Sequence, residues 1–566
     1  MHIFNFWINE LRKIKFMEMF IPKLFVTLKN YSKKQFYKDL LSGIVVGIIA
    51  LPLCIAFAIA SGVSPEKGII TGVIGGFLIS FLGGSRVQIG GPTGAFIVIV
   101  YGIVQNFGVD GLIYATFMAG IMLLIMGFAR LGSVIKFIPH TLIVGFTSGI
   151  ALIIFSSQMK DFFGLQMGNV PADFVLKWKS YFQHIDTVNY YAVFIAIGTV
   201  LISIFSTKLS TKIPGSLIAI LLSTIVVHIF NLNVETIGSK FGEISSAIPI
   251  PEIPSFDFAK IQQLVQPAFT IALLGGIESL LSAVVADGMI GGNHKSNMEL
   301  VGQGFANIFS AIFGGIPATG AIARTAANVK NGGRTPIAGI VHAVVLLFIM
   351  LVVGKWATLI PLSCLAGILV IIAYNMSEWR SFRAQLRTSK SDAAVMLTTF
   401  ILTVFVDLTV AIQIGMVLAV FLFMRRMTQI SNVNIITDKI NELDDEKAIT
   451  RYAVPKDVEV FEVSGPMFFG AAYKFKESMK LIENPPKILI IRMRYVPVID
   501  ATGLHTLDEV FKLAKRQGTI LILSGVGQGI YRELEKSDLL SELGKENVCP
   551  DIDRALERAE KILQNV

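Results

Sequence analysis

Charged residues are scarce in this sequence, and that scarcity limits the class of protein. Asp, Glu, Lys and Arg make up 16% of the 566 residues, whereas 53% of the residues are hydrophobic. Soluble domains carry about 25% charged residues, so most of this chain must face lipid or buried protein. A soluble multidomain protein is therefore excluded for all but the last quarter of the chain.

Several functional motifs are also missing. The three cysteines, Cys54, Cys364 and Cys549, have no metal-binding or disulfide spacing. No nucleophile–base pair is visible, so we do not expect an enzyme. The phosphate-binding pattern Gly-x-x-x-x-Gly-Lys-Ser/Thr is absent, so the chain lacks an ATP motor of its own. The net charge of +9 comes from basic residues that flank apolar runs, which indicates membrane topology rather than nucleic-acid binding.

Long apolar runs occupy the chain from Asp39 to Met424. A spanning helix needs about 20 apolar residues, and the runs predict about fourteen membrane elements, with a break near Asp407 in the last run. The clear runs are 40–62, 110–130, 134–157, 189–206, 214–231, 266–286, 336–354, 357–374 and 391–424. Shorter runs rich in Gly, Ala and Ser are 67–83, 92–106 and 300–314, and a further piece begins near Pro317.

Basic residues predict the topology. Lys and Arg favour the cytosolic side of a membrane, and they are frequent in residues 1–38 and again at Arg425 and Arg426. Both termini are therefore predicted to be cytosolic, which requires an even number of crossings. Residues 1–38 mix Lys with apolar residues and are predicted to form an amphipathic segment along the cytosolic surface.

The composition changes after the predicted transmembrane region, residues 39–430. Residues 431–454 are assigned to a linker, and residues 455–566 alternate short β-type runs with amphipathic stretches, which is typical of a small α/β domain. The predicted strands are Val458–Val463, Ile488–Arg492 and Thr519–Leu523. The predicted helices are Tyr473–Ile482, Thr502–Arg516 and Gly529–Ser537.

Two segments of the membrane region resemble each other. A small-residue helix precedes Gly91-Pro92-Thr93-Gly94-Ala95, and another precedes Pro317-Ala318-Thr319-Gly320-Ala321. Each pattern predicts a helix that begins inside the membrane, where free N–H groups and the positive end of the helix dipole can bind an anion. Paired interrupted helices are the best pointer to the binding site of a transporter, so the two helix starts are predicted to lie close together and to face each other across the site. Alternatively, the small residues only permit close helix packing.

Ionisable groups inside spanning segments are functional candidates because they are costly there. Glu278 lies in mid-helix, and Ser282 follows four residues later on the same face. Desolvation favours the neutral form of Glu278, so it can carry a coupling proton, or with Ser282 it can hold Na⁺. Arg324 follows the second interrupted segment and can attract an anion. Alternatively, Glu278 and Arg324 form an ion pair that only locks two helices.

Four motifs together resemble the sulfate permease (SulP) family, and the resemblance covers the chain from about residue 38. They are Ile89-Gly-Gly-Pro-Thr-Gly94, Ala286-Asp-Gly-Met289, Gly315-Ile-Pro-Ala-Thr-Gly-Ala-Ile-Ala-Arg-Thr325 and Gly332-Gly-Arg-Thr-Pro336. Within the family, Asn375–Glu378 and Leu422–Arg426 look closest to the bacterial DauA type, which carries C4-dicarboxylates. Other bacterial members carry sulfate or bicarbonate.

The resemblance implies an α-helical polytopic fold with a seven-plus-seven inverted repeat, like that of the uracil transporter. The repeats are expected at roughly 39–232 and 260–430, with a core domain that carries a small anion and moves against a gate domain. The positions that match the substrate-binding helices are Gly91, Pro92, Thr93, Gly94, Thr319, Gly320, Ala321, Ala323 and Arg324.

The resemblance also bears on the coupling ion, and no other cofactor is expected. In sodium-coupled bicarbonate members, an Asp stands at Glu278, a Thr at Ser282, and a tenth-helix hydroxyl where this chain has Ile322. The missing hydroxyl puts a sodium site in doubt and favours proton coupling through Glu278. Some proton-coupled members have an acid after the proline of the first helix, but here Leu53 follows that proline.

The tail resembles a STAS domain, similar to bacterial anti-sigma factor antagonists, through Val498-Ile-Asp-Ala-Thr-Gly-Leu504. In the antagonists a Ser at the place of Thr502 is phosphorylated, whereas in transporters the domain more often serves dimer assembly and trafficking. The resemblance therefore implies a homodimer in the cytoplasmic membrane and allows a cytosolic partner. A secondary active transporter is the leading interpretation. An anion channel or exchanger of the same fold and a membrane-anchored sensor are the alternatives.

The first prediction concerns topology. Protease added to inside-out vesicles should remove the tail from about residue 455 onward, because both termini are predicted to be cytosolic. Protease added to right-side-out vesicles should leave the tail intact, and an antibody against the last residues reads both experiments. The opposite pattern of protection would show that the topology is inverted.

Overall fold

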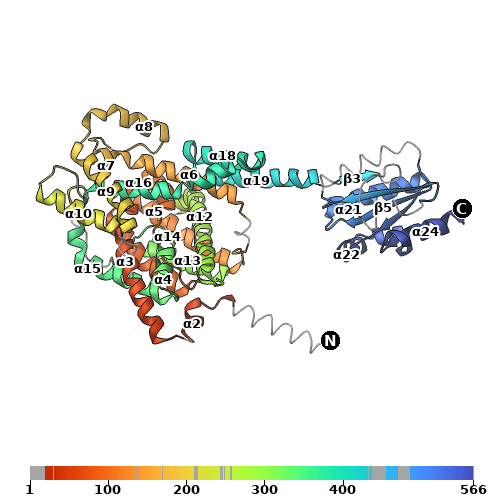
Figure 1. The fold of residues 1–566 in the computed structure, drawn as a ribbon, viewed down its shortest axis with the longest axis horizontal. Coiled ribbons are helices and arrows are strands. Elements are labelled where there is room, and N and C mark those ends of the chain that lie inside the picture. The colour runs from red at the N-terminus through yellow and green to blue at the C-terminus, as the bar shows by residue number, and fades with distance from the viewer. Residues whose placement is uncertain are drawn as a thin grey trace. The chain divides into compact units, whose positions relative to one another are not determined.

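The computed structural model describes most of the chain and divides it into two compact units, Met1–Val417 and Leu418–Val566 (Figure 1). The described residues are 19–29, 31–133, 138–168, 170–209, 215–242, 247, 249–254, 258–430, 432–435, 454–468 and 485–564. Residues 1–18 of the predicted amphipathic segment and the predicted helix Tyr473–Ile482 lie outside the described residues.

The first unit is helical, and its main elements fall into two series. The first series is α3 (Lys33–Ala60), α4 (Pro65–Leu82), β1 (Gly90–Gly91) with η1 (Gly94–Phe96) and α5 (Ile97–Phe128), α6 (His140–Ser157), α9 (Tyr190–Leu209) and α10 (Gly215–Ile229). The second series is α12 (Phe258–Ile290), α13 (Ser296–Ile312), β2 (Thr319–Gly320) with α14 (Ile322–Lys330), α15 (Ile337–Ala357), α16 (Leu362–Met376), α18 (Lys390–Phe405) and α19 (Leu408–Ile430), whose residues after Val417 belong to the second unit. Short helices join them: α2 (Lys23–Leu28), α7 (Met159–Phe163), α8 (Phe174–Gln183), α11 (Ile237–Phe241) and α17 (Trp379–Gln385).

Local chemistry explains where several helices are interrupted. Gly108 adopts φ 71° and ψ −175° within α5, so α5 is two helices joined at a residue that tolerates this conformation. The predicted break near Asp407 is confirmed, because the Asp407 carboxylate accepts the Thr409 N–H at 2.7 Å at the start of α19. The run 357–374 is predicted to be one helix, but α16 begins only at Leu362, directly after Pro361.

Among the described residues, seven helices are long and apolar enough to span a membrane, and three more are shorter apolar helices. Counting α5 as two helices, each series contains seven elements. The first four elements of each series pack together as a core bundle of α3, α4, η1, α5 and α12–α15. The last three elements of each series form a gate bundle of α6, α9, α10, α16, α18 and α19. This division confirms the predicted seven-plus-seven arrangement.

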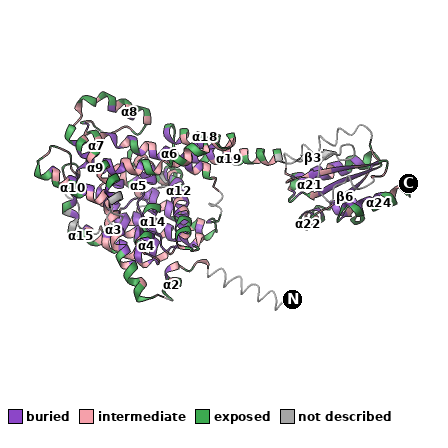
Figure 2. Cartoon of the chain, in the orientation of Figure 1, coloured by how far each residue is buried: buried purple, intermediate pink, exposed green. Residues whose placement is uncertain are grey.

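The second unit contains a five-stranded sheet in the order β3-β4-β5-β6-β7. Its strands are β3 (Asn432–Ile435), β4 (Val458–Ser464), β5 (Ile488–Tyr495), β6 (Ile520–Ser524) and β7 (Val548–Cys549). Among the described strands, only β3 runs antiparallel to its neighbour, and it lies in the segment that the sequence assigned to a linker. The central strands are buried (Figure 2) between two apolar clusters, as expected for a sheet with helices on both faces.

After Asn432, the helices of the second unit within the described residues are α21 (Ala501–Arg516), α22 (Gln528–Lys536), α23 (Leu539–Leu543) and α24 (Ile552–Gln564). The Asp500 carboxylate accepts the Gly503 N–H at 2.7 Å and caps α21, so Thr502 lies in the first turn of this helix as predicted. Thr502 is exposed. A phosphate there would meet the positive end of the helix dipole, and its phosphorylation stays a prediction.

The second prediction tests the close packing of α5 against α13. A Cβ added at Gly120 would lie 2.7 Å from the Gly304 carbonyl oxygen and 2.8 Å from the Ile308 nitrogen, whereas one added at Gly102 meets no atom within 4 Å. Gly120→Val should therefore destabilise the protein by about 1–3 kcal/mol relative to Gly102→Val, since overpacking forces the backbones apart. Thermal unfolding of the detergent-solubilised variants measures this difference. Equal losses in both variants would contradict the close contact between α5 and α13.

Candidate functional site

The two interrupted segments lie side by side. Gly90 pairs with Gly320, and Gly91 pairs with Thr319, in a two-residue antiparallel ladder. The helical turns that follow begin at Gly94 and at Ile322, so the predicted proximity of the two helix starts is confirmed. Gly91 has φ 144°, which a residue with a side chain rarely adopts, and a Cβ there would also meet the Arg324 guanidinium. Gly91 is therefore required by the backbone conformation of this turn and by the close approach of Arg324.

Arg324 and Glu278 hold the same turn from different helices. The Arg324 guanidinium donates a hydrogen bond to the Pro92 carbonyl oxygen. The Thr93 hydroxyl donates to a Glu278 carboxylate oxygen at 2.8 Å. Although both side chains are described, no ion pair joins Glu278 to Arg324, so the alternative of a simple locking pair does not describe the geometry. Arg324 is 2% exposed, whereas Glu278 is partly exposed.

The second interrupted segment is fixed by hydrogen bonds to α12 and to the first segment. The Thr319 hydroxyl donates to the Gly275 carbonyl oxygen at 2.8 Å, and the Ala321 N–H donates to the Ile89 carbonyl oxygen at 2.8 Å. The Ser282 hydroxyl donates to the Thr325 hydroxyl at 3.3 Å. Ser282 thus lies one turn from Glu278 but contacts α14 instead of the Pro92–Thr93 turn.

Most of the predicted positions are brought together, and one is not. The positions Gly91, Pro92, Thr93, Gly94, Thr319, Gly320, Ala321 and Arg324 are buried around the ladder. Ala323 is exposed, as is Ile322, with 38% of its surface accessible. The side chains of Ile322 and Ala323 therefore lie on the exposed face of α14, while Arg324 lies on its buried face.

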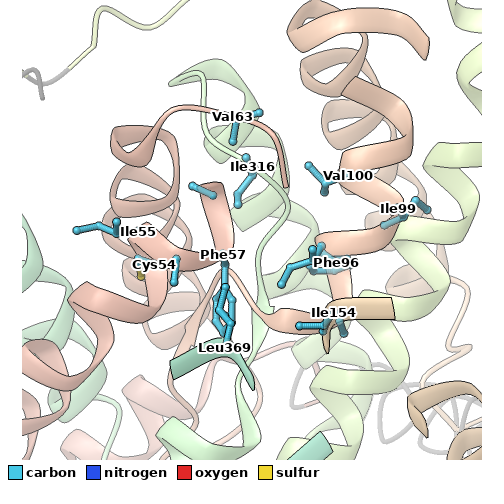
Figure 3. Packing of buried hydrophobic residues seen from close by; sticks show 14 of the residues in the cluster. Cys54, Ile55, Phe57, Val63, Phe96, Ile99, Val100, Ile154, Ile316 and Leu369 are labelled. Carbon is cyan, nitrogen blue, oxygen red and sulfur yellow. The ribbon is translucent and has the colours of Figure 1, made fainter. Parts of the chain in front are cut away.

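Apolar side chains from both bundles surround the start of η1. Figure 3 shows Phe57 and Phe96 of the core bundle in one buried cluster with Ile154 and Leu369 of the gate bundle. A Cβ added at Gly94 would lie 3.1 Å from the Met376 sulfur, and both Phe57 and Ile154 are in contact range. Because the surroundings are apolar, the free N–H groups at this helix start act in a low dielectric, where they attract an anion more strongly than in water.

A polar stripe on α13 supports the site and was not expected from the sequence. The Glu299 carboxylate is fully buried and accepts four hydrogen bonds at 2.8–3.0 Å. Their donors are the Gly84 and Ser85 N–H groups, the Ser279 hydroxyl and the Gln303 amide. Glu299 therefore fixes the loop that leads into β1.

Asn307 continues this stripe and fixes the other segment. Its side-chain amide donates to the Ala318 carbonyl oxygen at 2.8 Å and accepts the Ala318 N–H at 2.9 Å, one residue before β2. Glu299, Gln303 and Asn307 are spaced four residues apart and therefore share one face of the helix. That spacing is a signal visible in the sequence, but the small residues between the three positions indicate helix packing more strongly.

The arrangement can bind an anion and hold a proton. The helix starts supply N–H donors, Thr93 supplies a hydroxyl, and Glu278 supplies a partly exposed carboxylate that can change charge. Within the described residues, no group of three or more His, Cys, Asp and Glu side chains could hold a metal ion. The site residues thus fit binding and translocation of an anion.

Comparisons with known proteins agree with this chemistry. The sequence profile of the sulfate permease family matches residues 36–399, and that of the STAS domain matches residues 451–555. “Putative sulfate transporter YvdB” of Bacillus subtilis is 41% identical over 92% of this chain and 97% of its own length. The bicarbonate transporter BicA of the cyanobacterium Picosynechococcus is 30% identical over 92% of this chain and 94% of its own length.

Solved structures show the same fold. The structure of the murine anion transporter Slc26a9 covers 97% of this chain and 95% of its own length, with a TM-score of 0.87 and 19% identity. The transmembrane domain of a cyanobacterial BicA covers 69% of this chain and 98% of its own length, with a TM-score of 0.61 and 29% identity. The predicted inverted-repeat membrane fold is confirmed, while the closer resemblance to the DauA type stays a prediction.

The third prediction concerns Glu299. Glu299→Ala should destabilise the protein by at least about 3 kcal/mol, because four buried donors lose their acceptor at once. Glu299→Gln should have a smaller effect, since the amide oxygen can still accept some of these bonds. Exposed Glu252 provides the control, and Glu252→Ala should leave thermal unfolding unchanged. If Glu299→Ala unfolds at the same temperature as the wild type, Glu299 does not support the loop before β1.

Proposed function

This chain belongs to the sulfate permease family of anion transporters, and we propose that it is a proton-coupled secondary transporter of sulfate or bicarbonate. It works as a homodimer in the cytoplasmic membrane, with both termini in the cytosol. The single observation that carries the proposal is the Pro92–Thr93 turn, which is bonded to Arg324 on one side and to Glu278 on the other.

The geometry favours a small inorganic oxyanion over a C4-dicarboxylate. A dicarboxylate needs room and a second cationic partner, whereas Arg324 is the one cationic residue in the segments 89–96 and 319–325. Its guanidinium is already bonded to the Pro92 carbonyl oxygen. The cargo is then held mainly by N–H groups and the hydroxyl at the helix starts. The relatives named as sulfate and bicarbonate transporters support the same choice.

Glu278 is the proposed carrier of the coupling proton. An anion at the helix starts lies beside Thr93 and therefore near the Glu278 carboxylate, which accepts the Thr93 hydroxyl. The negative charge of the anion disfavours the ionised carboxylate and makes its protonation easier. Linkage of this kind is reciprocal, so a protonated Glu278 also binds the anion more tightly. The expected result is symport of H⁺ with the anion.

Movement of the core bundle against the gate bundle is the proposed translocation step. Both interrupted segments, Glu278 and Arg324 belong to the core bundle, so the whole site can move as one body. The contacts of η1 with the gate bundle are apolar side chains such as Ile154 and Met376, which can slide without breaking hydrogen bonds. An elevator-like motion of the core is therefore the simplest mechanism.

Sodium coupling is the second candidate, and one observation favours it. The Ser282 and Thr325 hydroxyls lie 3.3 Å apart, and Ser282 is one helical turn from Glu278. These oxygens are the kind of ligand that Na⁺ accepts in transporters. The exposed Ile322, however, supplies no oxygen at the position where the resemblance places a hydroxyl.

The fourth prediction tests cargo and coupling in proteoliposomes. Counterflow of labelled sulfate or bicarbonate should exceed that of succinate or fumarate, and uptake should follow an imposed pH gradient in sodium-free buffer. Glu278→Gln should lose at least about tenfold of the gradient-driven uptake, because its side chain cannot exchange a proton. Its counterflow without a gradient should fall less, since the amide can still accept the Thr93 hydroxyl.

Exposed Glu252→Gln is the control and should transport like the wild type. If the Glu278→Gln variant still concentrates the anion along a pH gradient, Glu278 is not the coupling residue. Wild-type uptake that follows a sodium gradient alone would select the sodium alternative. If no solute moves at all, the chain acts as a membrane-anchored sensor instead of a transporter.

A further inference from the structure

A polar pocket of about 400 Å³ lies apart from the site between the interrupted helices. Its lining includes Thr27, Tyr31, Ser32 and Gln35 from α2 and the start of α3, together with Arg86 and Arg334. None of the lining residues belongs to the gate bundle. The pocket is therefore no part of a path between the two bundles, and the transport mechanism does not use it.

Arg86 has no counterion in this pocket. Its Nε is buried without a hydrogen-bond partner, and no hydrogen bond or ion pair joins its side chain to any described residue. A buried guanidinium atom without a partner is costly, because the group loses water and gains nothing in return. Arg86 lies in the loop between α4 and β1, so this cost falls on the segment that leads to Gly91.

The carboxylate that holds the pocket walls, Asp39, is already used by other donors. Asp39 accepts the hydroxyls of Tyr31 and Thr335 and the amide of Gln35 at 2.6–2.9 Å. It also accepts the backbone N–H groups of Arg334 and Thr335 at 2.8 and 3.3 Å. Asp39 therefore fixes the pocket walls without pairing with Arg86.

The remaining charges near the pocket are mostly positive. Arg334 donates from one guanidinium nitrogen to the carbonyl oxygens of Val329 and Gly333, which hold the side chain in place without neutralising it. Lys23 is close enough to Arg86 for the two cations to repel each other. Asp287, a second described acid close to Lys23, accepts hydrogen bonds from the backbone N–H and the ring nitrogen of His294.

The start of α3 adds further attraction for an anion. Ser32 caps this 28-residue helix by accepting the Gln35 N–H at 3.2 Å, and both residues line the pocket. The positive end of the helix dipole therefore faces the same space as the two arginines. The Thr27 hydroxyl donates to the carbonyl oxygens of Lys23 and Leu24, and the Tyr31 hydroxyl donates to Asp39, so the donors left for a ligand in this wall are mainly those of the two arginines.

We propose that this pocket binds a phosphate-type oxyanion, either free or as the headgroup of an anionic phospholipid. Guanidinium groups match the geometry of such oxyanions through paired hydrogen bonds. α2 exposes Phe25, Val26 and Leu28, an apolar surface of the kind that lies in a membrane interface, so a lipid headgroup can reach the pocket. The bound anion contacts the start of α3 and the loops that precede β1 and α15. It therefore stabilises the loop that leads into the interrupted segment at Gly90–Gly91.

The fifth prediction tests the pocket with inorganic phosphate. The full-length protein is purified in detergent, stripped of lipid, and titrated with phosphate against chloride at equal ionic strength while thermal unfolding is followed. The wild type should show a saturable rise in unfolding temperature with phosphate. Arg86→Gln should bind phosphate about tenfold more weakly, because one charged hydrogen-bond partner is lost.

Arg387→Gln is the matched control, because Arg387 is an exposed arginine distant in sequence from the pocket. It should respond to phosphate like the wild type. Thr27→Glu places a negative charge at the pocket without touching Arg86, and it should weaken binding even if Arg86→Gln fails to fold. Equal losses in Arg86→Gln and Arg387→Gln would overturn the proposal.

A second arm of the experiment distinguishes the two sources of the oxyanion. If phosphate has no effect, anionic phospholipid added to the stripped protein should raise the unfolding temperature of the wild type but not of Arg86→Gln, whereas a zwitterionic phospholipid should do so for neither. That result assigns the pocket to a lipid headgroup. If phosphate and anionic lipid each change the unfolding temperatures of the wild type and of Arg86→Gln by the same amount, the proposal is wrong.

Discussion

The pairing of Gly90–Gly91 with Thr319–Gly320 is the constraint on which the rest of the membrane unit depends. Two helices that begin inside a bilayer leave backbone groups that cannot find water, and the ladder satisfies some of them where no regular helix can. Two neighbouring side chains of α14 satisfy further backbone groups at this junction. The Thr325 hydroxyl accepts the Ile89 N–H, and the Arg324 guanidinium donates to the Pro92 carbonyl oxygen. The remaining free N–H groups are then available for a ligand.

Support for the junction comes from polar groups that lie far from the open side of the site. Glu299 and Asn307 use one face of α13 to hold the approach to β1 and the approach to β2. In a similar way, Asp39 of α3 accepts the Thr335 hydroxyl from the segment between α14 and α15, and the Ser42 hydroxyl of α3 donates to Asn328 of α14. Because the Glu299 and Asp39 carboxylates each accept hydrogen bonds from several donors, these contacts can define a single geometry in an interior that is otherwise apolar.

The sequence predicted what depends on local pattern and missed what depends on distant partners. The two Thr-Gly-Ala motifs were sufficient to place the helix starts together, and the break near Asp407 and the helix from Thr502 were predicted correctly. Glu278 and Arg324 were found as candidates, but that they share the Pro92–Thr93 turn could not be read from spacing. The strand β3 looked like a linker because its partner β4 lies beyond a long polar stretch.

The contact between Arg324 and Pro92 joins residues 232 positions apart, and this separation has a consequence for biogenesis. At about 5–20 residues per second, a ribosome needs roughly 12–46 seconds to make the second segment after the first. During that interval the Gly90–Pro92 backbone has neither the ladder nor the guanidinium to satisfy it. The nascent first half must therefore wait at the insertion machinery or near the membrane surface, where water or a chaperone can solvate the turn, until the second half arrives.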